Sequence, residues 1–278
     1  MPRLITTREE LKAAQQSYRA KKVAFVPTMG ALHEGHLSLV KIAKQHADIV
    51  WVSIFVNPLQ FGPSEDFSKY PRTLDNDIAM LETVDVDYIW APSVEEMYGE
   101  GVNSQRSTVK ADIELNNCLC GLNRPGHFDG VCTVVKLLFD LIQPDVAVFG
   151  EKDYQQLMVI REMVVRLKLP VEIIGAPILR EASGLAMSSR NRYLSDIERK
   201  LADNIYQTLS YLSGLDRVSK QDLDQAKTKL EDLGMSVDYL EVHWGRIFAA
   251  AKIGSTRLID NVPVKQEFYI TEQSQTTF

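Results

Sequence analysis

Cysteine is scarce in this sequence, and the few cysteines present argue against both a disulfide-stabilised fold and a zinc ribbon. Cys118, Cys120 and Cys132 are an odd number without the paired spacing of a zinc ribbon. Cys118 and Cys120 are separated by a single residue, which is too close for an easy disulfide. We therefore expect reduced thiols in or near the core.

Long apolar runs and blocks of charge are missing as well. No apolar run is long enough to span a membrane, and the N-terminus lacks the apolar region of a signal peptide. The 31 basic and 37 acidic residues give a net charge of −6 without a Lys/Arg block. These absences predict a cytoplasmic protein with neither a membrane segment nor a nucleic-acid surface.

The sequence does contain a strand, a turn and a helix start that carries two histidines. An apolar run at 23–28 leads into a turn at Met29 and Gly30, and His33 and His36 stand where an amphipathic segment at 37–47 begins. Unpaired N–H groups and the positive end of the dipole at a helix start favour an anion. We interpret this stretch as a phosphate site; the alternative is a plain turn with two solvated histidines.

Other known motifs do not fit this stretch. His33 and His36 are three residues apart, whereas the H-E-x-x-H motif of zinc proteases places its histidines four apart. The strand leads into neither G-x-x-x-x-G-K-[ST] nor G-x-G-x-x-G. A zinc protease, a P-loop enzyme and a dinucleotide-binding turn are therefore not indicated.

Strand-like and helical patterns alternate through the first part of the chain. The apolar, strand-like runs after the first lie at 49–56, 88–91, 146–149 and 171–174. This alternation predicts a Rossmann-like parallel sheet in residues 1–176. Helices capped by Ser195 and Ser219, followed by further strand-like runs, predict a smaller α+β domain in residues 177–278.

Two stretches have no predicted place in this arrangement. Residues 92–129 contain a possible polar strand at 105–110 and a Gly/Pro-rich loop. The polar tail from Gln266 is expected to be loosely held.

Polar turns follow several strands of the expected sheet. Ligands bind beyond the carboxyl ends of parallel strands, so the two histidines, residues 57–60 and residues 150–153 are expected at one edge. Lys152 is predicted to reach a phosphate there, although a solvated lysine is the alternative. Farther along, residues 184–192 include two hydroxyls followed by two guanidinium groups. Taken alone they could form a surface loop, but together with the other polar turns they predict a flexible lid that binds a polyphosphate.

Seven motifs occur in one order along the chain. They are Pro-Thr-Met-Gly-Ala-Leu-His-Glu-Gly-His at 27–36, Phe-Val-Asn-Pro-Leu-Gln-Phe at 55–61, Tyr-Pro-Arg-Thr at 70–73, Arg-Pro-Gly-His-Phe at 124–128, Phe-Gly-Glu-Lys-Asp-Tyr-Gln-Gln at 149–156, Ser-Ser-Arg-Asn-Arg-Tyr-Leu at 188–194 and Thr-Arg-Leu-Ile-Asp-Asn at 256–261. In this order they resemble the signatures of the pantothenate synthetase family of the nucleotidylyltransferase superfamily. Residues 33–36 correspond to its H-I-G-H signature and residues 187–190 to its K-M-S-K-S loop.

The resemblance implies an ATP-dependent ligase that makes an amide bond. ATP and pantoate would give pantoyl adenylate and pyrophosphate, and β-alanine would then attack to give pantothenate and AMP. The family also implies Mg²⁺ and a homodimer. Catalysis of such a transfer is mostly positioning and charge stabilisation.

The resemblance further implies roles for individual residues. The catalytic residues would be His33, His36, Lys152 and Arg190, with His36 also as a proton donor. The residues implied to bind ATP are Met29, Gly30, Ala31, Leu32, His33, Glu34, Gly35, His36, Gly150, Glu151, Lys152, Asp153, Leu179, Met187, Ser188, Ser189 and Arg190. Those implied to hold pantoate are Asn57, Gln60 and Gln156, with Met29 and Phe61 as apolar walls. No metal ligand is assigned, and Asp77 is at most a weak candidate.

The chain departs from the family pattern at position 183, and two functions other than a ligase are considered. Ser183 stands where the family commonly has Asp, which could alter the flexibility of the lid. A nucleotidylyltransferase that makes a stable nucleotide-linked product would release no AMP when an amine is added. A regulatory module that has lost its chemistry would lack a catalytic position, and none is missing here.

Overall fold

The chain divides into two compact units, Met1–Leu179 and Arg180–Phe278. The computed structural model describes residues 1–18, 20–62, 65, 67–99 and 109–265. The predicted boundary at 176/177 lies close to this division.

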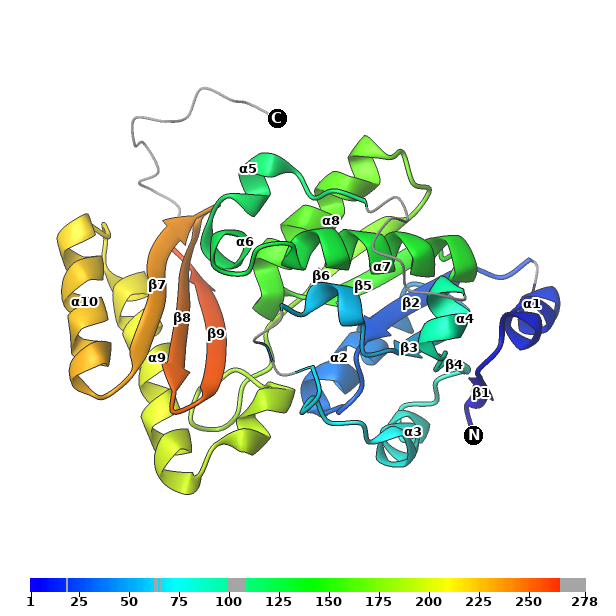
Figure 1. Cartoon of the computed structure of the whole chain (residues 1–278), viewed down its shortest axis with the longest axis horizontal. Coiled ribbons are helices and arrows are strands. Elements are labelled where there is room, and N and C mark those ends of the chain that lie inside the picture. Colours follow the sequence, from blue (N-terminus) through cyan, green and yellow to red (C-terminus); the bar gives the residue numbers. More distant parts are fainter. Residues whose placement is uncertain (19, 63–64, 66, 100–108, 266–278) are drawn as a thin grey trace. The chain divides into compact units, whose positions relative to one another are not determined.

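The first unit is built on a parallel sheet of six strands in the order β1-β4-β3-β2-β5-β6 (Figure 1). The strands are β1 (Arg3–Ile5), β2 (Val23–Thr28), β3 (Ile49–Ile54), β4 (Tyr88–Trp90), β5 (Val146–Gly150) and β6 (Glu172–Ala176). The Rossmann-like prediction is confirmed. β1 was not predicted, because three residues are too few to show a period.

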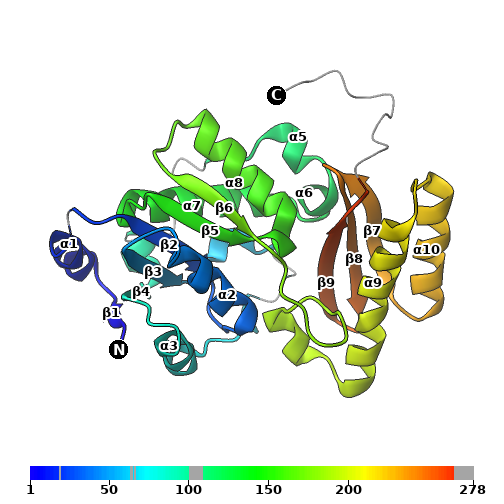
Figure 2. The same cartoon turned by 180° about the vertical axis from the view of Figure 1, so that it is seen from behind.

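Helices cover both faces of this sheet, with α2 and α3 on one face and α7 and α8 on the other (Figure 2). The helices and 3₁₀ turns of the unit are α1 (Arg8–Gln16), α2 (Glu34–Ala43), η1 (Pro58–Gln60), α3 (Leu74–Glu82), α4 (Val94–Tyr98), α5 (Ile113–Asn116), α6 (Leu119–Asn123), α7 (His127–Ile142), η2 (Glu151–Asp153) and α8 (Tyr154–Arg166). This covering explains why the strands read as continuous apolar runs.

Successive side chains of the central strands are buried on opposite faces of the sheet. Val26 and Val52 belong to the cluster that α2 and α3 cover, whereas the Phe25 ring packs edge-on against Phe139 of α7. Full burial of each such side chain contributes about 1.5–3 kcal/mol. The carboxyl ends of β2, β3 and β5 are thereby held in register, and the turns that follow them share one edge.

Part of the stretch without a predicted place forms short helices beside α8. Gln155 of α8 accepts the Cys120 N–H and donates to the carbonyl oxygens of Leu115 and Cys118, which fixes α5 and α6 against that helix. Of the possible polar strand at 105–110, Val109 and Lys110 are not in a strand, and residues 105–108 lie outside the described part of the chain. The tail from Gln266 also lies outside it.

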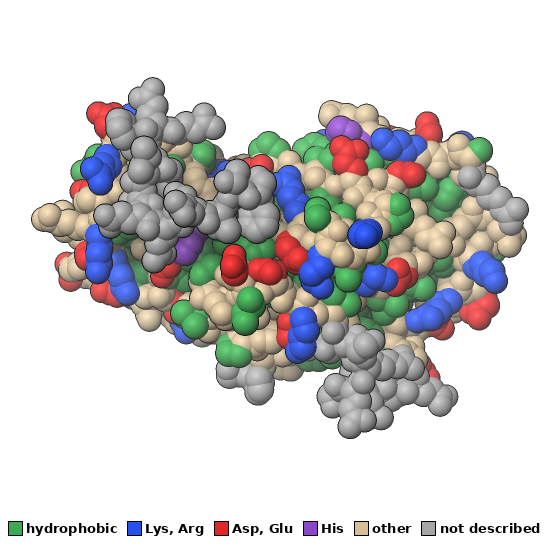
Figure 3. Space-filling model, turned by 90° about the horizontal axis from the view of Figure 1, so that it is seen from above, with side chains coloured by type: hydrophobic (Ala, Val, Ile, Leu, Met, Phe, Trp, Pro, Cys, Tyr) green, Lys and Arg blue, Asp and Glu red, His purple; other side chains and the backbone are tan. Residues whose placement is uncertain are grey.

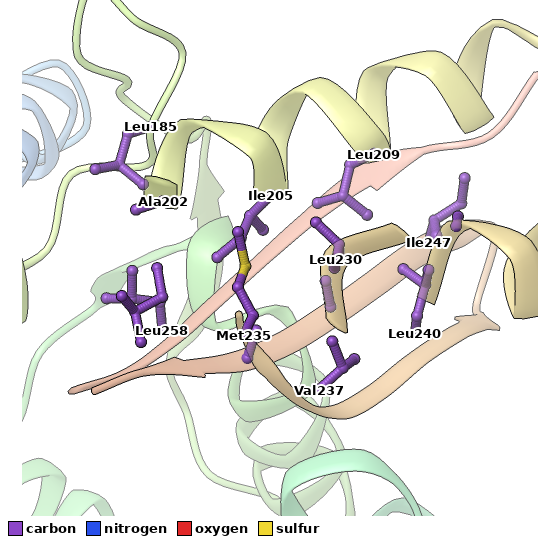
Figure 4. Close-up of a cluster of buried hydrophobic side chains, with 14 of the residues drawn as sticks. Leu185, Ala202, Ile205, Leu209, Leu230, Met235, Val237, Leu240, Ile247 and Leu258 are labelled. Atoms are coloured by element: carbon purple, nitrogen blue, oxygen red, sulfur yellow. The ribbon is translucent and has the colours of Figure 1, made fainter. Parts of the chain in front are cut away.

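The second unit packs two helices on an antiparallel sheet in the order β7-β8-β9. Its elements are η3 (Ser189–Tyr193), α9 (Asp196–Gly214), α10 (Lys220–Asp232), β7 (Ser236–His243), β8 (Arg246–Ile253) and β9 (Thr256–Pro263). In Figure 4, Ile205 and Leu209 of α9 and Leu230 of α10 face Leu240 and Ile247 of the sheet. The predicted α+β architecture is confirmed.

The composition-based expectations can be compared with the described residues. All three cysteines are free thiols, two of them buried. No helix in the described part of the chain is both long and apolar enough to cross a bilayer. Acidic and basic side chains of described residues are interspersed on the face drawn in Figure 3.

Candidate functional site

Helix α2 begins with a capping box made of two histidines. His33 is the N-cap residue, and its Nδ1 accepts the Gly35 N–H at 3.1 Å. The His36 Nδ1 accepts the His33 N–H at 3.3 Å, and the ring centroids are 4.0 Å apart. Because both Nδ1 atoms accept hydrogen bonds, each neutral ring carries its proton on Nε2. Each imidazole can therefore donate through Nε2.

The surroundings of His36 keep its ring neutral. Burial lowers the pKa of His36 well below its usual value, and the charges of His33 and Lys152 lower it further. At neutral pH this ring is a hydrogen-bond donor rather than a cation. The expected role of His36 as a proton donor stays a prediction.

Backbone N–H groups of the turn before α2 are already used inside the protein. The Ala31 N–H donates to Asp77 Oδ2 at 3.0 Å and the Leu32 N–H to Asp77 Oδ1 at 2.8 Å. The Gly30 N–H donates to Thr28 Oγ1 at 3.2 Å. These residues precede the helix start, where the unpaired donors were expected; within that start, the Gly35 N–H donates to His33 Nδ1 and the His36 N–H to the His33 carbonyl.

Asp77 supports this turn from the first turn of α3. Its side chain is fully buried and also accepts a hydrogen bond from Thr73 Oγ1 at 3.2 Å. From the sequence this carboxylate was only a weak candidate for a metal ligand, because an acid at a helix start is already explained by the dipole. The described residues contain no group of three or more His, Cys, Asp or Glu side chains that could hold a metal ion.

Lys152 lies in η2, immediately after β5. Its side chain is 20% exposed, and its Nζ is 3.7 Å from Asp153 Oδ2. Strand β5, which precedes Lys152, pairs in parallel with β2, which leads into the two histidines. The structure thus brings two histidines and a lysine to one edge of the sheet.

Asn57 and Gln60 follow β3 at the same edge. The Asn57 Oδ1 accepts from the Leu59 N–H and from the Tyr98 hydroxyl, at 3.2 and 2.7 Å. Its Nδ2 donates to the Gly130 carbonyl and to Gln60 Oε1, both at 3.1 Å. All four hydrogen-bonding positions of this buried amide are therefore used. Asn57 supports Gln60, whose Nε2 lies 2.9 Å from the sulfur of Met29.

A second network, which was not predicted from the sequence, holds the backbone of Gln60. Arg124 binds both carboxylate oxygens of Glu65 at 2.6 and 2.7 Å, and its Nη1 lies 2.9 Å from His127 Nε2. Because an arginine only donates, His127 accepts there and donates through Nδ1 to the Gln60 carbonyl at 2.8 Å. Burial, with the charge of Arg124, lowers the pKa of His127 to about 4. The Arg-Pro-Gly-His-Phe motif thus supports the backbone of Gln60. The only sequence signal for this role was that the motif is one of the seven that resemble the family's signatures.

For the other site residues expected in the first unit, the structure gives their element, ring contacts or exposure. The Phe61 ring contacts those of Phe67 and Tyr70. Gln156 is half-buried in the first turn of α8. Glu34 and Gly35 begin α2, Gly150 ends β5, Glu151 and Asp153 flank Lys152 in η2, and Leu179 is 39% exposed.

Residues 187–190, which were also expected to bind phosphate, are flanked by residues with several hydrogen bonds inside the second unit. Upstream of them, Arg180 binds Asp260 through both nitrogens at 2.6 and 3.0 Å and donates to the Gly184 carbonyl at 3.0 Å. Downstream, Asn191 is buried and donates to Glu181 at 2.8 Å and to the Ala186 carbonyl at 3.1 Å. The predicted flexible loop is therefore closely bonded within its own unit. Its expected meeting with His36 and Lys152 stays a prediction.

Several residues of this segment have definite local contacts. Ser188 caps η3 by accepting the Arg190 N–H at 3.3 Å, and Ser189 is buried while Met187 is half-buried. Ser183 donates to Asp203 Oδ1 at 2.7 Å. An Asp at position 183 would face that carboxylate, so serine suits this chain.

One protein family and its members match nearly the whole chain. The family model of pantoate-beta-alanine ligase matches residues 3–263. A pantothenate synthetase of Psychrobacter arcticus is 50% identical over 282 residues, which cover 94% of this chain and 97% of that protein. A pantothenate synthetase of Acinetobacter baylyi is also 50% identical, over 279 residues covering 94% of this chain and 98% of that protein.

Solved structures with the same fold carry the same names. A pantothenate synthetase from Thermus thermophilus has a TM-score of 0.87 and 44% identity, covering 94% of this chain and 99% of that one. A pantoate-beta-alanine ligase from Francisella tularensis, complexed with beta-gamma ATP and beta-alanine, has a TM-score of 0.87 and 38% identity. It covers 95% of this chain and 98% of the other. The likeness thus extends over nearly the whole chain.

Proposed function

This chain belongs to the pantoate-beta-alanine ligase family, and from that premise we propose how its residues carry out the reaction. It is a ligase that joins pantoate to β-alanine with ATP as co-substrate. The proposed route has two steps. The pantoate carboxylate attacks the α-phosphorus of ATP and displaces pyrophosphate, and the amine of β-alanine then attacks the mixed anhydride and displaces AMP.

The observation that carries this proposal is the grouping of His33, His36 and Lys152 at the end of the sheet. The two imidazoles donate through Nε2, and Lys152 supplies a positive charge beside them. Displacement at the α-phosphorus spreads negative charge over the phosphate oxygens and the leaving group. Fixed donors and a cation stabilise that charge without having to reorganise. His36 acts in this scheme as a neutral donor.

Pantoate binds beside this group, against residues after β2 and β3. The Gln60 Oε1 already accepts from Asn57, so its Nε2, which lies beside the Met29 sulfur, is the group that can donate to a pantoate oxygen. Met29 and Phe61 provide apolar surface for the dimethyl group, and Gln156 of α8 provides a further amide. Asn57 and His127 act through Gln60 rather than on pantoate itself.

The second unit contributes the other phosphate contacts. Ser188, Ser189 and Arg190 bind the polyphosphate, and hydrogen bonding within the unit fixes the segment that holds them. Residues 150–153, Leu179 and Met187 border the nucleotide.

Further proposals concern the metal, the assembly and the compartment. From the family resemblance, Mg²⁺ is proposed to bind with ATP, where it would neutralise the charge of the phosphates. A cytoplasmic homodimer is proposed from the family resemblance.

An isotope experiment tests the two-step route. Exchange of labelled pyrophosphate into ATP is expected with pantoate present and β-alanine absent. When the pantoate carboxylate is labelled with ¹⁸O, one label is expected in AMP after β-alanine is added. Exchange that requires β-alanine, or AMP without label, would contradict the adenylate. A stable nucleotide-linked product with no AMP released would favour a nucleotidylyltransferase instead.

A further inference from the structure

We propose that Asp77 is the positioning residue of the two-histidine turn, holding the backbone that aims His33 and His36. The inference rests on the proposed function of that turn. Asp77 touches neither substrate nor reacting atoms in this scheme and acts through the backbone of residues 31–33.

The carboxylate binds two consecutive backbone N–H groups of the turn. The Ala31 N–H donates to one oxygen at 3.0 Å and the Leu32 N–H to the other at 2.8 Å. The next N–H, of His33, donates to the His36 ring at 3.3 Å. Three successive N–H groups are thus fixed, the first two by Asp77 and the third by the site itself. A shift of the Leu32 backbone would therefore move the N-cap histidine.

The conformation of this turn needs such support. Gly30 has φ +78° and Ala31 has φ +51°, so an alanine lies in the left-handed region that side chains rarely adopt. A residue persists there when surrounding contacts determine its conformation. The hydrogen bond from Ala31 to Asp77 is such a contact, and Ala31 itself is fully buried.

The carboxylate also lies in direct contact with the turn. A Cβ added to Gly30 would be 2.9 Å from Asp77 Oδ2 and 3.0 Å from a methyl carbon of Ile54. Asp77 is completely buried, and its two oxygens accept hydrogen bonds from the turn and from Thr73. The turn and the carboxylate therefore fix each other.

Helix α3 does not need Asp77 as its dipole partner, since Asp75 occupies the same first turn and is exposed. Thr73, the N-cap residue, makes no side-chain cap bond and instead donates its hydroxyl to Asp77. Both features direct the carboxylate toward the turn rather than toward its own helix. Asp75→Asn is consequently a matched control, with the same charge change in the same helical turn.

The test compares Asp77→Asn with Asp75→Asn. An Asn side chain has one acceptor oxygen, so its NH₂ group must face one of the two turn N–H groups, donor against donor. Pantoate-dependent pyrophosphate exchange per folded molecule is expected to fall about 100-fold in Asp77→Asn, the scale of a small misplacement of catalytic groups. Asp75→Asn should exchange like the unaltered protein. Loss of less than threefold in Asp77→Asn would overturn the inference.

Imidazole NMR gives a second readout that needs no activity. In Asp77→Asn the ring signals of His33 and His36 should shift, while those of the other three histidines, His46, His127 and His243, should not. Unchanged His33 and His36 signals would also overturn the inference. If the unaltered protein showed no exchange at all, the proposed function would fail, and these signals would still decide the role of Asp77.

A milder variant covers the case in which Asp77→Asn does not fold. Thr73→Val keeps the shape of the side chain and removes only the hydroxyl donor to the carboxylate. The exchange rate should fall about fivefold, as expected for the loss of one hydrogen bond, with smaller shifts of the same two histidine signals. An exchange rate and signals like those of the unaltered protein would count against Asp77.

Discussion

Replacing Arg180 by methionine is expected to destabilise the second unit by about 3–5 kcal/mol, the usual cost of breaking a buried ion pair. The Arg180 side chain is 18% exposed and that of Asp260 only 4%. Methionine retains much of the aliphatic stem but removes both bonds to Asp260, the bond to the Gly184 carbonyl and the contact of the guanidinium over the Tyr206 ring. The buried carboxylate of Asp260 then loses the charge of Arg180.

A double-mutant cycle separates charge from packing. In Arg180→Met with Asp260→Asn, the buried residue at position 260 is neutral, so this double variant should be about 1–2 kcal/mol more stable than Arg180→Met alone. Lys252→Met is the control, because its ammonium lies 3.7 Å from Asp238 with a side chain that is 49% exposed. That change should cost less than about 1 kcal/mol.

Urea unfolding followed by hydrogen exchange in peptides from residues 196–263 measures the second unit separately from the first. If Arg180→Met costs less than about 1 kcal/mol, the pair is screened by solvent and the reasoning from burial fails. If the double variant is no more stable than the single one, the loss comes from packing rather than charge.

Three further predictions concern the first unit. Lys152→Met should lower pantoate-dependent pyrophosphate exchange by about 100-fold or more, with little change in melting temperature by differential scanning fluorimetry, because Lys152 lies in a surface 3₁₀ turn; unfolding would indicate a structural lysine. Gly130→Ala places a Cβ 2.2 Å from the Leu59 carbonyl oxygen, so η1 should be displaced and the KM for pantoate should rise about tenfold. Gly214→Ala is the control, because a Cβ there meets nothing within 4 Å and should leave the KM unchanged. Equal KM values for the two variants would contradict this prediction. The third prediction concerns pH: folding lowers the pKa of His127 from 6.5 to about 4, so between these pH values the unfolded chain binds a proton that the folded chain does not. The free energy of unfolding should therefore fall by about 3 kcal/mol as the pH drops from 6.5 to 4. Urea titrations should show a smaller fall in His127→Gln, and identical falls would refute the assignment.

Local signals in the sequence were sufficient for much of the fold. The helix caps at Ser195 and Ser219 were predicted because each depends on residues three positions apart. Strands buried on both faces were visible as continuous apolar runs. Strand β8 was missed because its centre, at 249–251, is three alanines, which carry no strand preference.

The edge of the sheet at which the site lies followed from the order of strands and turns. Parallel strands place their carboxyl ends together, so His36, Gln60 and Lys152 could be assigned to one edge before any contact was known. The motifs in their order added the chemistry. Sequence alone therefore determined the family resemblance and the sheet, and it predicted which polar residues share one edge of that sheet.

The tertiary structure decided which groups at that edge are available and which are already bonded. The sequence does not show which acceptor an N–H group of the turn will find. For Ala31 that acceptor is Asp77, which lies 46 residues away in the sequence. Likewise, His127 and Gln60 are 67 residues apart, and neither residue signals the other. Hydrogen bonds across such separations depend on how the elements pack, so no local pattern predicts them. They occupy the amides of Ala31 and Leu32, whereas the donor role of the histidine rings stays a proposal.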